Sequence, residues 1–366
     1  MTSTEMNDTP LFFWPHTFDP CVASYRIRCK NVMDGLSDAG ITSKYYPGKL
    51  RQRLKLTPHI EAPRTLVISK MTRPKYLQWA VSLKKRYGTR LILDICDNIF
   101  FESSPGAAMK ERTRQTIEAL DHFDVIVTPS RFLGDQIAMH LRPDMRFAFI
   151  PDAIEPEPDV TLPVRWRERQ AFRELQQLED FIDQSAIAPG RKLVWFGSHG
   201  AKAAQNGMND VRKLLPILEK HHGQQRISLT IVSNHREKYE KFFGQSPIET
   251  FYLEWNAYTV SRCIQKHDIT IIPISPNDYN LSKSANRLTT AFSNGTAVCA
   301  SAIGSYEPFR ESAVFDDWED GLAALMQSQP ERHRRIEAGN ATIRQNYTQQ
   351  AISDEWKRLL ATLSDS

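Results

Sequence analysis

Four residues near position 285 have the types and the spacing that bind phosphate. Lys283, Ser284, Asn286 and Arg287 follow a polar loop and open a segment with helical periodicity. Backbone N–H groups at a helix N-terminus are unpaired and carry partial positive charge, so two cations placed there oppose the helix dipole. The conflict is resolved if an anion lies in front of the helix. We therefore predict a diphosphate site here, with an ordinary surface helix as the alternative.

A second group of candidate phosphate contacts follows the apolar run 193–196. Gly197, Ser198 and His199 open a loop with two glycines, which lets backbone amides approach a ligand closely. The loop matches neither the Gly-x-Gly-x-x-Gly nor the Walker pattern. Trp255 could cover a flat base or simply pack in the core. Later strand ends add three candidate donor contacts: Asn234, Trp255 and Asn256.

An acidic strand end supplies the candidate base. Asp97 and Asn98 come directly after the apolar run 90–95, and Asn98 is a candidate acceptor contact. A carboxylate in this position could accept the proton of an attacking hydroxyl, or it could cap the loop. Asp94, inside the run, is expected to be structural.

Three basic residues are candidate contacts for an acidic or phosphorylated acceptor. Arg26 and Arg28 are expected in the first strand-to-helix loop, and Lys70 ends the run 65–69. Each could hold a phosphate or a sugar acid. Salt bridges within the fold are the alternative.

The elements that must position these residues alternate along the chain. Short apolar runs typical of buried parallel strands are separated by segments with helical periodicity, which predicts a doubly wound α/β fold. In such sheets ligands bind beyond the carboxyl ends of the strands. The expected strands are 65–69, 90–95, 125–128, 147–150, 193–196, 228–232, 269–274 and 297–300, and the expected helices are 75–87, 109–123, 131–140, 208–221 and 259–266.

The alternation breaks once, between residues 155 and 192. This segment opens with Glu-Pro-Glu-Pro, continues through a charged helical stretch and ends at Pro-Gly. It predicts two α/β domains around a shared cleft. The predicted domains are residues 1–155 with a C-terminal helix over 345–366, a linker with a helical insertion over 156–190, and residues 191–344.

Charge and cysteine content limit the classes of binding partner and the cell compartment that we expect for this protein. The net charge of +4 is too small to indicate nucleic acid, but residues 44–90 hold thirteen Lys or Arg and one acidic residue, Glu61. This stretch could face anionic lipid or be a solvated basic face. Beyond Tyr45, Tyr46 and Tyr76, the basic stretch lacks the interleaved surface aromatics typical of nucleic-acid binding. The five cysteines are not spaced as metal ligands, and Cys96 and Cys299 lie inside apolar runs, which fits a reducing cytoplasm. The apolar run 11–14 is too short for a signal peptide or a membrane span.

Several segments, taken in order, resemble GT-B fold glycosyltransferases of the family 4-like kind, a group that includes many bacterial polysaccharide and lipopolysaccharide enzymes. They are "FDVIVTPSRFLGDQI", "FAFIPDAIEPEP", "LVWFGSHG", "HDITIIPIS", "KSANRLTTAFSNGTAVCAS", "SYEPF" and "NYTQQAISDEWKRLL". The resemblance covers most of residues 65–360. It implies two Rossmann-like domains facing a cleft, and a C-terminal helix that crosses back to the first.

The resemblance also implies a reaction: transfer of a sugar from a nucleotide-activated donor to a hydroxyl of a saccharide or lipid-linked acceptor, in cell-surface polysaccharide synthesis. Lys283 and Arg287 would stabilise the leaving phosphate, without a metal ion and without a cofactor beyond the donor substrate. The expected location is cytoplasmic, with peripheral contact at the inner face of the membrane.

One departure from the family pattern leaves alternatives open. Retaining enzymes of this kind usually carry two glutamates eight positions apart, and those places fall on Ser282 and Thr290. The second glutamate normally holds the donor ribose. Retaining or inverting outcome and the nucleotide therefore stay open. A non-catalytic GT-B-like subunit, a nucleotide-sugar epimerase and a phosphopolyol transferase are the other interpretations.

Overall fold

The computed structural model describes residues 10–48, 63–101, 107–200 and 205–364. The chain forms two compact units, and each is built from more than one segment. Unit 1 comprises Met1–Ala153, Leu281–Ser284 and Asn346–Ser366, and unit 2 comprises Ile154–Asn280 and Ala285–Gln345.

Unit 1 is built on a six-stranded sheet in the order β2-β1-β3-β4-β5-β6, with all pairs parallel. Successive residues of its strands contribute to two different apolar cores, so both faces of the sheet are covered: Leu66 and Ile68 belong to one core and Val67 to the other. The direction of the connections reverses between β1 and β3. The strands are β1 (Leu11–Pro15), β2 (Ser43–Tyr45), β3 (Thr65–Ser69), β4 (Arg90–Asp94), β5 (Val125–Thr128) and β6 (Phe147–Phe149).

The helices of unit 1 include one from the far end of the chain. In α16, Trp356 is fully buried and lies edge-on to Phe13 of β1, with ring centroids 6.1 Å apart. This helix packs against α2, where Gly35 leaves room for Ser353. The helices are α1 (Ala23–Tyr25), a π-helical segment η1 (Arg26–Lys30), α2 (Asn31–Asp38), α4 (Pro74–Tyr87), α5 (Ala107–Leu120), α6 (Arg131–Ala138) and α16 (Gln349–Ser364).

Unit 2 has a second parallel sheet of six strands, in the order β12-β11-β10-β7-β8-β9. Read from β7, the chain adds strands to one side and then, from β10 on, to the other, which is the Rossmann order. The switch point lies between β7 and β10. The strands are β7 (Lys192–Phe196), β8 (Ser228–Ser233), β9 (Glu249–Glu254), β10 (Ile269–Ile272), β11 (Ala297–Ala300) and β12 (Val314–Phe315).

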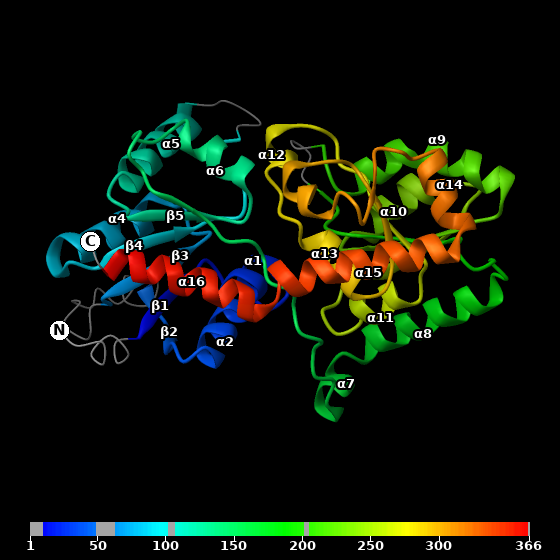
Figure 1. Cartoon of the computed structure of the whole chain (residues 1–366), viewed down its shortest axis with the longest axis horizontal. Coiled ribbons are helices and arrows are strands. Elements are labelled where there is room, and N and C mark those ends of the chain that lie inside the picture. Colours follow the sequence, from blue (N-terminus) through cyan, green and yellow to red (C-terminus); the bar gives the residue numbers. More distant parts are fainter. Residues whose placement is uncertain (1–9, 49–62, 102–106, 201–204, 365–366) are drawn as a thin grey trace. The chain divides into compact units, whose positions relative to one another are not determined.

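The helices of unit 2 follow its strands, apart from two that precede β7. These two, α7 (Leu162–Arg167) and α8 (Arg169–Gln184), form the insertion before the sheet (Figure 1). The others are α9 (Met208–Gln224), α10 (Arg236–Phe243), α11 (Val260–Gln265), α12 (Asp278–Leu281), which ends at the boundary with unit 1, α13 (Asn286–Ser293), a 3₁₀ segment η2 (Gly304–Phe309), α14 (Asp320–Gln327) and α15 (Gln329–Asn346).

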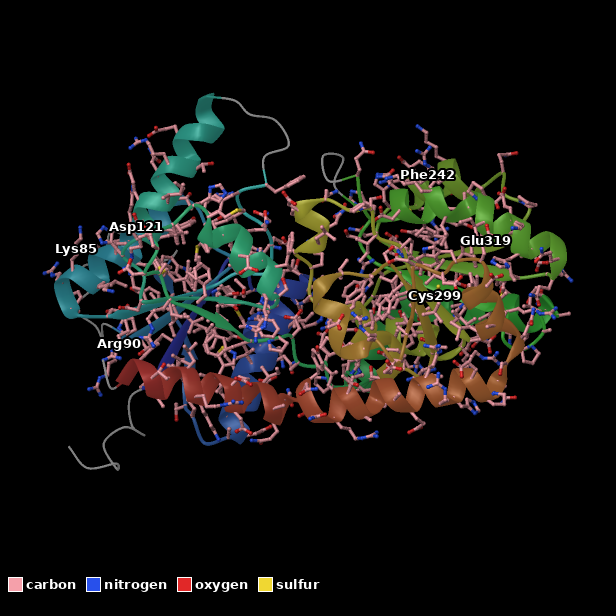
Figure 2. All side chains as sticks on the ribbon, turned by 45° about the horizontal axis from the view of Figure 1, so that its top comes forward. Lys85, Arg90, Asp121, Phe242, Cys299 and Glu319 are labelled. Atoms are coloured by element: carbon pink, nitrogen blue, oxygen red, sulfur yellow. The ribbon has the colours of Figure 1, made fainter. Side chains whose placement is uncertain are left out.

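Most large apolar side chains lie in the interior of each unit, and most charged side chains lie on its surface. Figure 2 shows Cys299 on β11 within the body of unit 2, whereas Lys85, Asp121 and Glu319 lie on the surface. Cys299 is fully buried, as expected, but Cys96 is only half-buried. None of the helices in the described ranges has both the length and the apolar character needed to cross a bilayer.

These observations confirm the predicted doubly wound α/β class, with all eight expected strands present. The structure adds β1, β2 and β12, and it gives bounds to β9, the strand expected before Trp255. Two local expectations are wrong. Arg26 and Arg28 lie on the η1 segment and not in a loop, and α13 begins at Asn286, so Lys283 and Ser284 precede it.

Candidate functional site

The glycine loop of unit 2 follows β7, at the switch point where doubly wound sheets bind ligands. Its glycines are required by close backbone approach. A Cβ on Gly200, which has φ +92°, would lie 1.9 Å from the Asn206 carbonyl oxygen, and one on Gly207, with φ +72°, would lie 2.5 Å from the Ser198 carbonyl oxygen. The loop therefore turns back on itself directly after the strand.

Arg287 lies beside this loop. A Cβ built on Gly197 would be 3.8 Å from its Nη1 atom, so the guanidinium and the loop backbone occupy neighbouring space. Arg287 is on the first turn of α13, whose N-cap, Ala285, offers no side-chain cap, and the turn contains no acidic residue. Arg287 thus comes together with Gly197 in unit 2, and Asn286 precedes it on the same helical turn. This juxtaposition is what an anionic ligand would need.

His199 is fixed by its neighbours. Its backbone N–H and its Nδ1 both lie about 3 Å from Oδ1 of Asn234, at 2.9 and 3.0 Å. An amide oxygen only accepts, so Nδ1 carries the proton and Nε2 can accept. Lys238 Nζ donates to the His199 carbonyl at 2.6 Å. Asn234 therefore orients the loop histidine, while Ser198 is exposed.

Asp210 and Ser275 connect the loop after β10 to α9, and neither residue is among the predicted site residues. Asp210 Oδ1 accepts from the Ser275 N–H at 3.1 Å and from its hydroxyl at 2.5 Å. Burial raises the pKa of Asp210, against the effect of these bonds and of the nearby Arg287. Tyr306, in the quoted segment "SYEPF", is buried close enough to Arg287 to feel its charge. Within the described residues its hydroxyl has no hydrogen-bond partner.

Trp255 and Asn256 are away from this place. They follow β9, the edge strand, which β8 separates from β7. The Asn256 amide is already engaged, because it donates to Glu168 at 2.9 Å and accepts from the Tyr258 N–H at 2.9 Å. Trp255 is half-buried. Asn256, a predicted donor contact, therefore has its side chain bonded to the α7–α8 insertion.

In unit 1, Arg28 forms salt bridges within the fold, with Asp94 and Asp152. It is 2% exposed and donates to Asp94, to Asp152 and to two carbonyls at the end of β6. Burial would lower the pKa of Arg28, but the two carboxylates outweigh burial and raise it. The predicted acceptor contact Arg28 is thus a side chain that the fold itself already engages, through Asp94 and Asp152. Asp94 is structural, as expected.

Asp97 lies between two ammonium groups. Lys70 Nζ is 2.6 Å from its Oδ2 and Lys283 Nζ is 2.6 Å from its Oδ1. Burial would raise the pKa of Asp97, but the two lysines and the hydrogen bonds they donate hold it well below its usual range. A carboxylate with so low a pKa is a weak proton acceptor, which opposes its predicted role as the base.

The other acceptor candidates are also engaged. Arg26 is half-buried and donates to the Pro20 carbonyl at 2.9 Å. Asn98 is 8% exposed, and its side-chain oxygen accepts from the Phe100 N–H, so it caps the turn that Asp97 was considered for. Lys70 has φ 53° at the end of β3, a conformation that directs its chain sharply away from the strand.

The segment Leu281–Ser284 belongs to unit 1 through three contacts. Besides the Lys283 pair, the Ser282 carbonyl accepts from Ser130 Oγ at 2.8 Å and Ser284 Oγ donates to Asp152 at 2.5 Å. The structure thus separates the four residues of the predicted phosphate segment. Lys283 and Ser284 serve unit 1, and Asn286 and Arg287 serve unit 2. Ser130 lies in the segment "FDVIVTPSRFLGDQI" and Asp152 in "FAFIPDAIEPEP", but only the tertiary contacts show that these two residues hold the segment 282–284.

The cations of the basic stretch 44–90 fall partly outside the described residues, and two of the described ones are paired with carboxylates. Four of its cations, Lys49, Arg51, Arg53 and Lys55, lie outside the described residues. Lys70 pairs with Asp97, and Lys84 pairs with Asp124. Within the described ranges no three His, Cys, Asp or Glu side chains gather as a metal ion would require.

No protein-family profile matches the sequence, and no curated protein sequence matches it significantly. Solved structures match almost the whole chain. HepE from Anabaena, in complex with UDP and glucose, has 10% identity and a TM-score of 0.65, and covers 96% of this chain and 99% of its own. Sucrose-phosphate synthase from Thermosynechococcus elongatus has 11% identity, a TM-score of 0.67, and coverages of 97% and 99%.

A third structure extends the same pattern. The α,α-trehalose 6-phosphate synthase from Burkholderia multivorans has 12% identity and a TM-score of 0.61, and covers 98% of this chain and 99% of its own. At such identities the likeness establishes the fold. This chain has the GT-B fold, with both of its Rossmann-like units present.

Proposed function

We propose that this protein is a glycosyltransferase of the family 4-like kind. It transfers a sugar from a nucleotide-activated donor to a hydroxyl of a saccharide or lipid-linked acceptor, in cell-surface polysaccharide synthesis. The single observation that carries the proposal is the position of Arg287 beside Gly197, at the switch point of a Rossmann-ordered sheet. Similar solved structures support a uridine nucleotide, since they include complexes of HepE with UDP and with UDP-glucose.

The residues of unit 2 have separate roles in this proposal. Backbone amides of the loop at Gly197–His199 and of the first turn of α13 donate to the diphosphate. The Arg287 guanidinium neutralises the charge that grows on the leaving phosphate as the glycosidic bond breaks, so transfer needs no metal ion. The proposed grip rests on Arg287, because the Lys283 ammonium is already paired with Asp97.

A second candidate, a GT-B subunit that supports a partner enzyme, rests on one observation. Thr290, in the middle of α13, stands where the family carries the glutamate that holds the donor ribose. Such a subunit would show neither transfer nor slow hydrolysis of UDP-glucose. Either activity in the purified chain would exclude it.

The proposal is tested by changing Arg287 to Ala and measuring nucleotide binding by calorimetry. A lost charge-assisted hydrogen bond to phosphate should weaken UDP binding about tenfold or more, while binding of uridine stays unchanged. The matched control is Arg344→Ala, which removes an exposed arginine from α15 of the same unit and should leave UDP binding as it is. Equal UDP affinity in wild type and Arg287→Ala would contradict the proposed donor site.

A further inference from the structure

Helix α7 has no buried residue. Its two large apolar side chains, Leu162 and Trp166, are 84% and 73% exposed. They lie four positions apart and therefore share one face of the helix. Figure 1 shows α7 beyond the N-terminal end of α8 and apart from the sheet of unit 2. An apolar face is thus presented on a projecting element.

This exposure is unusual within the protein. Leu162 and Trp166 are the two most exposed large hydrophobic residues of the described ranges, ahead of Met139 at 69% and Phe18 at 52%. A six-residue helix is also far below the length that is stable in isolation, so helices of this size normally depend on packing. A covering surface would supply that packing.

The surroundings of the apolar face are strongly basic. Between positions 161 and 173 there are four arginines and one acidic residue, Glu168, which is paired with Arg167 at 2.9 Å. Arg169 lies over the Trp166 ring, with Cζ 5.4 Å from its centroid. The remaining arginines, Arg165 and Arg173, are exposed.

We propose that α7 docks this protein on an anionic membrane surface. Tryptophan and leucine insert into the boundary between headgroups and acyl chains, and arginines bind lipid phosphates while their stems follow the apolar layer. The net positive charge of residues 161–173 complements the negative potential of an anionic leaflet. A short exposed element that carries tryptophan, leucine and arginines suits a flat, fluid surface.

The docking element is held in place before it meets the membrane. Arg167 donates to the Tyr258 hydroxyl at 3.2 Å, and Glu168 accepts from Asn256 at 2.9 Å. Helix α8 continues from α7, buries Leu178 completely, and places Phe181 5.3 Å from the Phe251 ring of β9. Unit 2 therefore presents α7 from a fixed base, and docking does not require the proposed transferase activity.

The test measures sedimentation with vesicles of phosphatidylglycerol in phosphatidylcholine. The double variant Leu162→Ser/Trp166→Ser should lose affinity by about tenfold or more, because the buried apolar area disappears. Arg165→Gln/Arg169→Gln should lose affinity at low salt and abolish most of the salt dependence. The control Met139→Ser/Arg344→Gln removes an exposed apolar residue and an arginine elsewhere and should bind as wild type.

A spectroscopic arm locates the contact. Brominated lipid should quench tryptophan fluorescence in wild type, and Trp166→Phe should remove that quenching while it keeps vesicle binding. The proposal is overturned if wild type fails to bind anionic vesicles at low salt, or if the Leu162/Trp166 variant binds as well as wild type. Binding lost only when the basic residues of 44–90 are changed would also overturn it, as would a wild-type dimer that the Leu162/Trp166 variant dissociates.

Discussion

At the scale of single residues, the two acidic strand-end positions of unit 1 have different partners. Asp94 is buried against the one guanidinium of Arg28, whereas Asp97 is shared by two lysines and remains 19% exposed. The carboxylate of Asp97 is therefore better suited to hold Lys70 and Lys283 together than to accept a proton. Without it, two ammonium groups would repel each other near the end of β4.

Asp97→Asn should consequently lower the free energy of unfolding of unit 1, by about 1.5–3 kcal/mol for a lost charged hydrogen bond. The pKa of Asp97 is depressed in the folded state, so the contribution is present above the ordinary aspartate pKa and is lost as pH falls through the folded value. The difference between variant and wild type should thus be constant from pH 5 to 8 in urea denaturation. Asp34→Asn, in an exposed pair with Lys30, is the control and should change little.

The pH–rate profile separates this role from that of a base. If Asp97 only positions the lysines, wild type and Asp97→Asn should share any acid limb of kcat/KM. An acid limb present in wild type and absent from Asp97→Asn would show that Asp97 accepts the proton after all.

At the scale of elements, the position of α13 depends on its packing against α15. Gly339 of α15 faces Phe292 of α13, and a Cβ there would lie 2.5 Å from the ring atom nearest the backbone. Phe292 is fully buried and stacks on Phe309, with centroids 5.8 Å apart, so the ring cannot move away cheaply. The close packing of α13, the helix that carries Arg287, against α15 therefore requires a residue without a side chain at position 339.

Gly339→Ala should destabilise unit 2 by about 1–3 kcal/mol through overpacking. Thermal unfolding and UDP affinity would both report the displacement of α13. Gly223→Ala, at an open position near the end of α9, is the matched control and should be neutral or stabilising by up to about 1 kcal/mol. Equal melting temperatures for the two variants would mean that α13 and α15 adjust without cost.

At the scale of the whole molecule, one buried histidine links stability to pH. His267 is 6% exposed, with Nδ1 2.7 Å from the Cys263 carbonyl and Nε2 2.7 Å from the Thr230 hydroxyl. Burial lowers the pKa of His267 to about 4, although the bond to the Cys263 carbonyl acts in the opposite direction. The neutral ring is thus the folded form.

Because the unfolded chain binds this proton near pH 6.5 and the folded chain only near pH 4, the stability of unit 2 should fall as pH decreases between these values. The loss is on the order of 3 kcal/mol at full protonation of the unfolded state. Denaturation of His267→Gln at a series of pH values should show a shallower slope over this range. The exposed His122→Gln is the control and should keep the wild-type slope. An unchanged slope in His267→Gln would assign the acid sensitivity to other groups.

The sequence predicted the elements better than the partners of their side chains. Alternating apolar runs suffice to identify parallel strands such as β3, β5 and β11, because strands buried on both faces are continuously hydrophobic. Among the strands outside the eight expected ranges, β2 and β12 are short and β9 is at an edge of its sheet, whereas β1 has five buried residues and lies between β2 and β3. Which lysine meets which carboxylate depends on strand order and on contacts between distant segments, and spacing along the chain does not contain that information. Hence spacing predicts one helical turn over 283–287, although residues 283–284 and 285–287 belong to different units.

The burial of Trp356 against Phe13 also determines when unit 1 can be completed during synthesis. The ribosome makes the six strands of its sheet first, but the core on one face needs Ile352, Trp356 and Leu359 of α16. Until those residues emerge, the nascent sheet exposes the apolar surface that they later cover, and all of unit 2 is made in the interval. The sheet of unit 1 is therefore completed only after unit 2 has been made, and its exposed apolar surface is prone to aggregation during that interval.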